Sequence, residues 1–214
     1  MTIRVQEIFG PTVQGEGHWT GKSVYFVRLH GCPVGCYFCD TGYSQQNDYG
    51  RHLPRSDLSV EQIVDRVSPA SHVVISGGEP FAQAELPALC AALLIERGKF
   101  VSIETSGVTW REVSPAVWIT LSPKQHLFED GRNTVDDRFW QRADEIKLVI
   151  SDGTELDYYR RRGKLPPLFS RTPLYLQPEW RESDEPLAKT LQIIATNPET
   201  TRLSLQTHKF IGVE

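Results

Sequence analysis

The stretch VYFVRLHGCPVGCYFCDT, residues 24–41, combines a predicted strand with a cluster of cysteines. Its apolar, β-branched and aromatic first half is typical of a buried strand and stops at Gly31. Three cysteines then follow within eight residues, Cys32, Cys36 and Cys39, in the spacing C-x3-C-x2-C. Because a closed tetrahedral metal site uses four ligands, the presence of only three needs an explanation.

The composition of the 214-residue chain excludes several classes of protein. Its formal net charge of −4 is unlike that of a domain with a broad nucleic-acid footprint, which is normally basic. The N-terminal stretch MTIRVQEIFG lacks the apolar core of a signal peptide, and no apolar run approaches the ~20 residues that span a bilayer. We therefore expect a soluble, cytoplasmic protein with neither nucleic acid nor a membrane as its partner.

The fourth cysteine, Cys90, differs from the other three in its surroundings. It stands alone in ELPALCAALLIERG (85–98), where the apolar residues have helical spacing. A free cysteine on such a face behaves as a small hydrophobic residue, so we expect Cys90 in the core. Clustered cysteines in a reducing compartment, in contrast, more often bind metal or serve catalysis than form disulfides.

The expected fold follows from strands that alternate with helices. A capping-box spacing at Ser59 and Gln62 starts one helix, Gly98 ends the next, and a third fits 185–195 with Leu187, Leu191, Ile194 and Ala195 on one face. Short β-branched runs predict strands over 24–29, 72–76, 100–104, 117–121, 146–150 and 174–177. About six parallel β-α units are too few for the eight of a closed barrel. The prediction is an α/β fold, an incomplete (β/α) barrel in a single domain over residues 1–214.

Chemically suggestive groups come directly after these predicted strands. The cysteines follow the first strand, and four further groups follow later strands: GGEP (77–80), TSG (105–107), SPK (122–124) and Gln177-Pro178. Parallel α/β proteins build their sites at the carboxyl ends of the strands, from the loops that follow. We therefore expect these scattered motifs to converge on one face.

Two metal sites are compatible with the three cysteines. His30 could complete a Cys3His zinc site, although no second pair of ligands lies downstream as in most structural zinc sites. Alternatively, the cysteines hold three irons of a four-iron cluster and leave the fourth iron open to a ligand. In that case three cysteines are a requirement, because a fourth would close the reactive position.

The four-iron interpretation is supported by a resemblance to the radical S-adenosylmethionine (SAM) superfamily. The resemblance lies in the cysteine spacing and in Phe38, which precedes the last cysteine. There, the amino and carboxylate groups of SAM chelate the open iron, and one electron cleaves SAM to a 5′-deoxyadenosyl radical. GGEP strengthens the resemblance, since its glycines permit close approach to the SAM amino group and Glu79 offers that group an acceptor. Taken alone, GGEP would be an ordinary glycine turn before a helix.

A narrower resemblance extends from residue 7 to residue 209. The chain is similar to the 7-carboxy-7-deazaguanine synthase family in EIFGPTVQGEG (7–17), VRLHGC (27–32), CDT (39–41), SGGEP (76–80), SPK (122–124), LQP (176–178) and LQTHK (205–209). The resemblance implies a radical ring contraction of 6-carboxy-5,6,7,8-tetrahydropterin with loss of ammonia, in queuosine and deazapurine biosynthesis. It also implies catalytic use of SAM, a 4Fe-4S cluster, Mg²⁺, a homodimer, and an electron donor such as flavodoxin or ferredoxin.

The same resemblance implies the residues that bind substrate. A pterin presents an amino group beside a ring N–H, a donor pair that the Glu16 carboxylate could accept. Arg28, a cation in an apolar strand, could hold the substrate carboxylate in a bidentate fork or form a structural salt bridge. The implied substrate contacts, which include N- and C-terminal segments, are Val13, Gln14, Gly15, Glu16, Arg28, Ser76, His208 and the terminal Glu214.

The remaining implied contacts are to the cofactors. Cys32, Cys36 and Cys39 would hold the cluster, and the Thr41 hydroxyl would ligate Mg²⁺ together with substrate oxygens and water. No side chain is expected to be a catalytic residue, since SAM supplies the radical. SAM itself would be bound by Phe38, Cys39, Asp40, Gly78, Glu79, Ser122, Pro123, Lys124, Gln177 and Pro178.

Two rival functions share some of these features. A radical SAM activase acting on a protein glycine would keep the cluster and GGEP but would not need Glu16 and Arg28. A zinc-stapled binding module would keep only the cysteines. The basic run YYRRRGK (158–164) is interpreted as a solvated helix end and not as a nucleic-acid contact.

Overall fold

The computed structural model describes residues 2–42, 52–96, 98–128, 131, 133–165, 172–180 and 183–213. All six predicted strands are present, within one or two residues of the expected bounds. They are β2 (Ser23–Leu29), β4 (His72–Gly77), β5 (Phe100–Thr105), β6 (Trp118–Leu121), β7 (Glu145–Ile150) and β8 (Leu174–Pro178). Each pairs in parallel with the next. A short parallel strand, β9 (Thr201–Leu203), extends the series beyond the prediction.

The strands of the described residues form one curved sheet in the order β3-β1-β2-β4-β5-β6-β7-β8-β9. The strands β1 (Thr2–Val13) and β3 (Ser56–Ser59) were not predicted; β1 runs antiparallel to β2, and β3 antiparallel to β1. The two ends of the order, β3 and β9, are edges that do not pair with each other. The sheet is therefore an unclosed barrel, and the predicted α/β fold class is confirmed.

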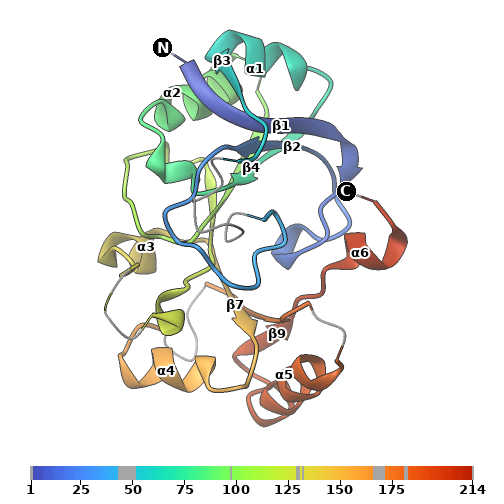
Figure 1. Ribbon diagram of the computed structural model, residues 1–214, viewed down its shortest axis with the longest axis vertical. Helices are drawn as coiled ribbons and strands as arrows, with labels where there is room; N and C mark the ends of the chain where they lie inside the picture. The colour runs from blue at the N-terminus through green and yellow to red at the C-terminus, as the bar shows by residue number, and fades with distance from the viewer. Residues whose placement is uncertain are drawn as a thin grey trace.

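Helices surround this sheet (Figure 1). The predicted capping box is present, because the Ser59 N–H donates to Gln62 Oε1 and the Gln62 N–H donates to Ser59 Oγ. The helical segments are α1 (Val60–Arg66), α2 (Leu86–Ala91) with its continuation η4 (Ala92–Glu96), α3 (Asp137–Arg142), α4 (Glu155–Arg161), α5 (Glu185–Thr196), α6 (Thr207–Ile211), and the short turns η1 (Gly17–Trp19), η3 (Pro80–Ala82) and η5 (Gln125–Leu127). No helix in the described ranges is long and apolar enough to cross a membrane.

The main apolar core lies between the sheet and these helices, and it contains Cys90 at 0% exposure, as predicted. The predicted apolar face of α5 is wrong in part. Leu191 is 47% exposed and Ala195 is exposed, whereas Pro186 and Thr190 are the buried residues. The Thr190 hydroxyl donates to the Pro186 carbonyl 2.7 Å away, which satisfies it within the helix.

The concave side of the sheet is polar, because successive side chains of a strand point to opposite faces. In β7, Ile146, Leu148 and Ile150 belong to the apolar core. The alternate residues Glu145 and Lys147 face inward, and both are buried. A buried charge in a strand requires partners on the inner side, and the chain supplies them from a segment that follows β1.

That segment, residues 14–19, lies against the inner side of the sheet. The His18 N–H donates to Glu145 Oε2 at 2.9 Å. The Trp19 ring packs edge-on against the rings of His72, Phe100 and Trp118, which stand at the amino ends of β4, β5 and β6. One end of the barrel is thus closed by aromatic side chains, and the cavity described next opens at the other end.

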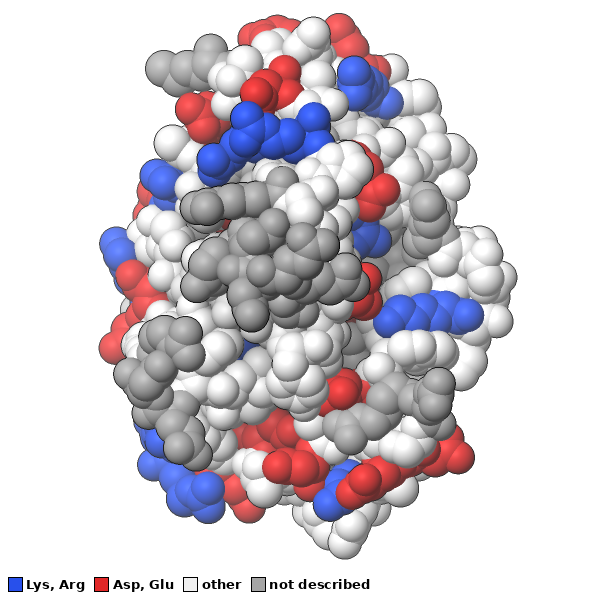
Figure 2. Space-filling model, in the orientation of Figure 1, with Lys and Arg blue, Asp and Glu red and all other residues white. Residues whose placement is uncertain are grey.

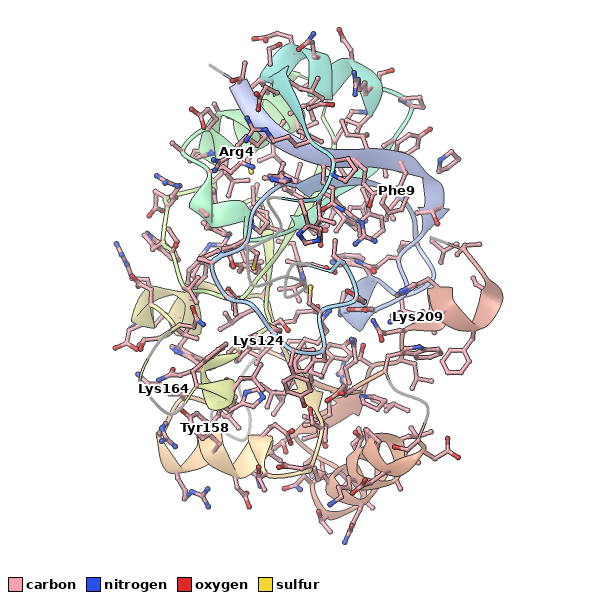
Figure 3. All side chains as sticks on the ribbon, in the orientation of Figure 1. Arg4, Phe9, Lys124, Tyr158, Lys164 and Lys209 are labelled. Carbon is pink, nitrogen blue, oxygen red and sulfur yellow. The ribbon has the colours of Figure 1, made fainter. Side chains whose placement is uncertain are left out.

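Charges of both signs are interspersed on the face shown in Figure 2, and no continuous basic band crosses its described residues. The basic run 158–164 ends helix α4, where the Arg162 guanidinium lies 3.6 Å from the centre of the Tyr158 ring. Tyr158 and Lys164 lie at the periphery of the molecule, whereas Lys124 lies nearer its centre (Figure 3).

Candidate active site

A cavity of about 500 Å³ lies at the carboxyl ends of the parallel strands. The predicted convergence is confirmed, because loops from β2, β4, β5, β6 and β8 meet there with residues 13–16 and the C-terminal segment. Gly15, Glu79 and Pro123 lie beside the cavity and not on its wall, and Glu214 lies outside the described residues. The predicted residues on the wall are Val13, Gln14, Glu16, Arg28, Cys32, Cys36, Phe38, Cys39, Asp40, Thr41, Ser76, Gly78, Ser122, Lys124, Gln177, Pro178 and His208.

The three cysteines of the loop after β2 line this cavity as free thiols. Burial raises the pKa of the Cys32 thiol to about 12 and that of Cys36 above its ordinary value. Thiols of this kind become thiolates when a metal replaces the proton. Three thiols from one loop, open to one cavity, are a donor set that fits a cluster with three protein ligands.

His30 does not join the cysteines. It is 5% exposed and is absent from the cavity wall, and the charged groups that act on it are Arg55, Arg4 and Asp57. Among the described residues, no three His, Cys, Asp or Glu side chains gather closely enough to hold a single metal ion. The Cys3His zinc interpretation therefore has no support from the position of His30.

The GGEP glycines pack directly against the cysteine loop. The Gly78 N–H donates to the Leu29 carbonyl at 2.8 Å, and the Glu79 N–H donates to the Gly31 carbonyl at 3.0 Å. A Cβ on Gly78 would come within 3.0 Å of that Gly31 carbonyl oxygen and 3.1 Å from the Cys32 nitrogen. Glycine is required at Gly78 because two backbones approach each other there, whatever ligand the cavity holds.

Glu79 organises a second loop. Its carboxylate is 1% exposed, and it accepts hydrogen bonds from the Thr105 hydroxyl at 2.6 Å, from the Ser106 hydroxyl and N–H, and from the Phe81 N–H. Burial raises the pKa of Glu79 in spite of these bonds. Four donors occupy its four lone-pair positions, so Glu79 ties GGEP to the TSG loop.

Glu16 lies at the centre of the polar wall. Its Oε2 pairs with the Lys147 ammonium, and its Oε1 accepts from Gln206 Nε2 at 2.8 Å. Burial alone would raise the pKa of Glu16, but Lys147 and the two hydrogen bonds outweigh burial and lower the pKa to about 2. The same pairing holds the pKa of Lys147 above its ordinary value, although burial acts to lower it. Both groups are therefore charged at neutral pH.

Glu104 links two of the predicted substrate contacts. Its Oε1 accepts from Gln14 Nε2 and its Oε2 accepts from the Ser76 hydroxyl, both at 3.1 Å. Gln14 in turn accepts from the Glu16 N–H at 3.1 Å. The loop after β1 and the end of β4 are thereby held in one arrangement on the cavity wall.

Arg28 forms the salt bridge that its sequence allowed, and its contact with a substrate carboxylate stays a prediction. Its Nε lies 3.0 Å from Glu7 Oε1 in a salt bridge, and its guanidinium lies 5.2 Å and 5.8 Å from the Phe9 and Phe26 ring centres. It also lines the cavity and donates through its NH1 group to the Thr41 hydroxyl at 3.3 Å. A guanidinium on the cavity wall can receive a carboxylate.

The C-terminal segment folds back onto the same wall. The Thr207 N–H and hydroxyl both donate to the Gly15 carbonyl, and the buried Ser204 hydroxyl bridges the Gly17 N–H and Gln177 Oε1. The Lys209 ammonium lies 3.3 Å from Asp40 Oδ2. At Gly15 a Cβ would overlap the His208 ring, so glycine allows His208 to reach the cavity.

Two lysines of the wall differ in their partners. Lys124, in the SPK loop, donates to the Ser122 carbonyl at 2.7 Å and to its hydroxyl at 2.5 Å. Burial lowers the pKa of Lys124, and the neighbouring Lys147 lowers it further. Sequence reasoning missed Lys147, although the argument made for Arg28, a cation in an apolar strand, applies to it equally. Other wall residues that were not predicted include Tyr37, Glu104, Glu179, Trp180, Gln206 and Lys209.

Comparison with known proteins gives a consistent result. Residues 26–118 match a model of the radical SAM superfamily. The 7-carboxy-7-deazaguanine synthase of Synechocystis sp. is 37% identical over 204 residues, which cover 94% of this chain and 89% of that protein. The Escherichia coli protein of the same name is 34% identical over 232 residues, covering all of both chains. The crystal structure of QueE from Escherichia coli aligns with a TM-score of 0.73 at 29% identity, over 95% of this chain and 93% of that one.

Proposed function

The chain belongs to the 7-carboxy-7-deazaguanine synthase family of radical SAM enzymes, and from this premise we propose how its residues handle the substrate. The family's reaction converts 6-carboxy-5,6,7,8-tetrahydropterin to 7-carboxy-7-deazaguanine with loss of ammonia. One observation carries the proposal: a single cavity joins three free thiols, an ionised glutamate and an arginine. Neither a glycyl-radical activase nor a zinc module needs that combination.

We propose that Glu16 and Arg28 bind opposite ends of the pterin. The aminopyrimidinone edge presents two adjacent N–H donors to Glu16, whose carboxylate Lys147 and Gln206 already hold in place. The substrate carboxylate pairs with Arg28, whose guanidinium already forms a salt bridge with Glu7. Gln14 and Ser76, joined through Glu104, contact the ring between these two ends, and His208 covers it from the C-terminal segment. A direct contact by Glu214 remains part of the proposal.

Cys32, Cys36 and Cys39 would hold the 4Fe-4S cluster. When bound, the cluster supplies the electron that cleaves SAM to the radical that abstracts the substrate's C6 hydrogen. The chain's own contribution is to bind SAM between the cysteine loop and the SPK and LQP loops, and to exclude water. The Thr41 hydroxyl, which accepts a hydrogen bond from Arg28 at 3.3 Å, would be the protein's oxygen ligand for Mg²⁺.

Further parts of the proposal rest on family membership alone. They are a single domain over residues 1–214, a homodimer, and an electron donor such as flavodoxin or ferredoxin. We also place the enzyme in the cytoplasm, because its cluster thiols must stay reduced before they bind iron.

The proposal is tested by the anaerobic, cluster-reconstituted protein with SAM, Mg²⁺, dithionite and 6-carboxytetrahydropterin. We expect 7-carboxy-7-deazaguanine by mass spectrometry from the wild type and from the surface control Glu185→Gln. Glu16→Gln should lose at least 90% of product formation while still cleaving SAM slowly to 5′-deoxyadenosine. An enzyme that cleaves SAM but makes no product would contradict the pterin assignment and leave the radical chemistry standing.

A further inference from the structure

Lys147 is a buried lysine on the cavity wall that pairs with Glu16. It extends from the inner face of β7 and is 5% exposed, and its ammonium contacts the Glu16 carboxylate. Glu104 and Glu145 are the other carboxylates whose charge acts on it. Lys147 is therefore a buried cation among three acidic side chains, of which Glu16 and Glu104 line the cavity.

The pairing fixes the hydrogen-bonding character of Glu16. One carboxylate oxygen binds Lys147 and the other accepts from Gln206 Nε2 at 2.8 Å, so the plane of the group is set from both sides. An ionised carboxylate is an acceptor only, whereas a protonated one offers one donor and one acceptor. Without a cation beside it, a carboxylate that is largely removed from water has a raised pKa and is protonated more readily.

We propose that Lys147 determines which heterocycle the cavity accepts, by keeping Glu16 an acceptor for two adjacent N–H donors. This deepens the proposed function and rests on it. A 2-amino-4-oxo ring, as in a pterin, presents that donor pair. A 2-oxo ring, as in a lumazine, places a carbonyl beside its N–H and sets that oxygen against an oxygen of Glu16. Lys147 acts through Glu16 and is a positioning residue, not a catalytic one.

The other charged groups around Glu16 do not replace Lys147. The charges of His208 and Lys124 also act on it, but neither group is among the side chains that form a hydrogen bond with it. Burial lowers the pKa of each of these two groups. Glu104 and Glu145 are acidic and supply no positive charge, so Lys147 is the cation that pairs with Glu16.

The test is equilibrium binding of 6-carboxypterin and 6-carboxylumazine to the reconstituted protein with SAM and Mg²⁺, followed by ligand fluorescence. The variants are Lys147→Met and Glu16→Gln. The matched control is Lys99→Met, which removes a second buried lysine, one that donates to the Ser68 carbonyl at 2.8 Å and is not on the cavity wall. Thermal unfolding of every variant accompanies the binding data.

We expect the wild type and Lys99→Met to prefer the pterin by about 100-fold, the size of effect that mismatched buried polar groups produce. Lys147→Met should bring the preference below about tenfold, mainly by tighter binding of the lumazine. Glu16→Gln, whose amide offers a donor group and an acceptor, should prefer the lumazine. This variant still tests the acceptor role of Glu16 if Lys147→Met does not fold.

A Lys147→Met protein that binds both ligands more weakly by the same factor would overturn the inference, because that is the behaviour of a structural residue. A Glu16→Gln protein that keeps the 100-fold preference for the pterin would overturn it as well. If the wild type, with its cluster loaded and SAM cleavage intact, binds neither ligand, the proposed function itself fails.

Discussion

Replacing Gly78 with alanine should release the cysteine loop from β4. The new Cβ would lie within 3.0 Å of the Gly31 carbonyl oxygen, which is backbone and cannot rotate away. Restoring an ordinary carbon–oxygen contact of about 3.3 Å moves the two segments apart by roughly 1 Å. The hydrogen bonds from Gly78 to Leu29, at 2.8 Å, and from Glu79 to Gly31, at 3.0 Å, would both be lost.

The magnitude of this change can be worked from those contacts. Two hydrogen bonds contribute about 1 kcal/mol each. Overpacking a tight contact costs about 1–3 kcal/mol more. We therefore expect Gly78→Ala to reduce the free energy of unfolding of the cluster-free protein by about 3–5 kcal/mol. Because the clash is against the loop that holds Cys32, iron bound per chain after anaerobic reconstitution should also fall below half that of the wild type.

Urea unfolding and an iron assay on the same preparations measure both effects. The control is Gly163→Ala, where φ is +62° and nothing lies within 4 Å of the added Cβ. It should cost only the strain of a left-handed residue, about 1–2 kcal/mol, with iron content unchanged. A Gly78→Ala protein with wild-type stability and a full complement of iron would refute the packing argument.

Three further predictions test other parts of the molecule. Ser204→Ala leaves the Gly17 N–H and Gln177 Oε1 without their buried partner. The free energy of unfolding in urea should fall by about 2–4 kcal/mol, and a decrease below about 0.5 kcal/mol would argue against the Ser204 bridge. Burial lowers the pKa of His72 to about 4, so the folded protein should lose about 1.5 kcal/mol through it as the pH falls from 6.5 to 5. His72→Gln should remove that loss of stability. The loss due to His126, whose pKa is also about 4, should persist. A free energy of unfolding with the same pH dependence in His72→Gln as in the wild type would contradict this. Thr41→Ala should raise the Mg²⁺ concentration for half-maximal activity about tenfold, in contrast to Thr41→Ser, and equal Mg²⁺ curves would exclude a role for the hydroxyl.

The sequence predicted the strands that carry dense β-branched runs and missed those that do not. In β1 the pattern is interrupted by Gly10 and Pro11, and only Ile3 and Val5 of the strand are fully buried. β9 has three residues, too few for any periodicity. The exposed Leu191 of α5 shows a different limit, since helical spacing marks several possible apolar faces and packing selects one.

The position of the site was predictable because parallel strands end at one edge. The ion pairs and hydrogen bonds within the site were not predictable, since they depend on the face of the strand to which each side chain points. Lys147 and Glu104 lie in predicted strands, yet only the observed register turns them inward toward residues 14–16. Glu79 illustrates the reverse case, because its motif predicts a SAM contact and its carboxylate is surrounded by donors of the protein. Its contact with SAM stays a prediction.

The most direct test of the account is the stoichiometry of the reaction in the reconstituted enzyme with 6-carboxytetrahydropterin. We predict one ammonia released for each 7-carboxy-7-deazaguanine formed, over many turnovers, with SAM recovered intact and little 5′-deoxyadenosine. Equal amounts of 5′-deoxyadenosine and consumed SAM, with neither ammonia nor the deazaguanine acid, would show a radical enzyme that acts on a different substrate.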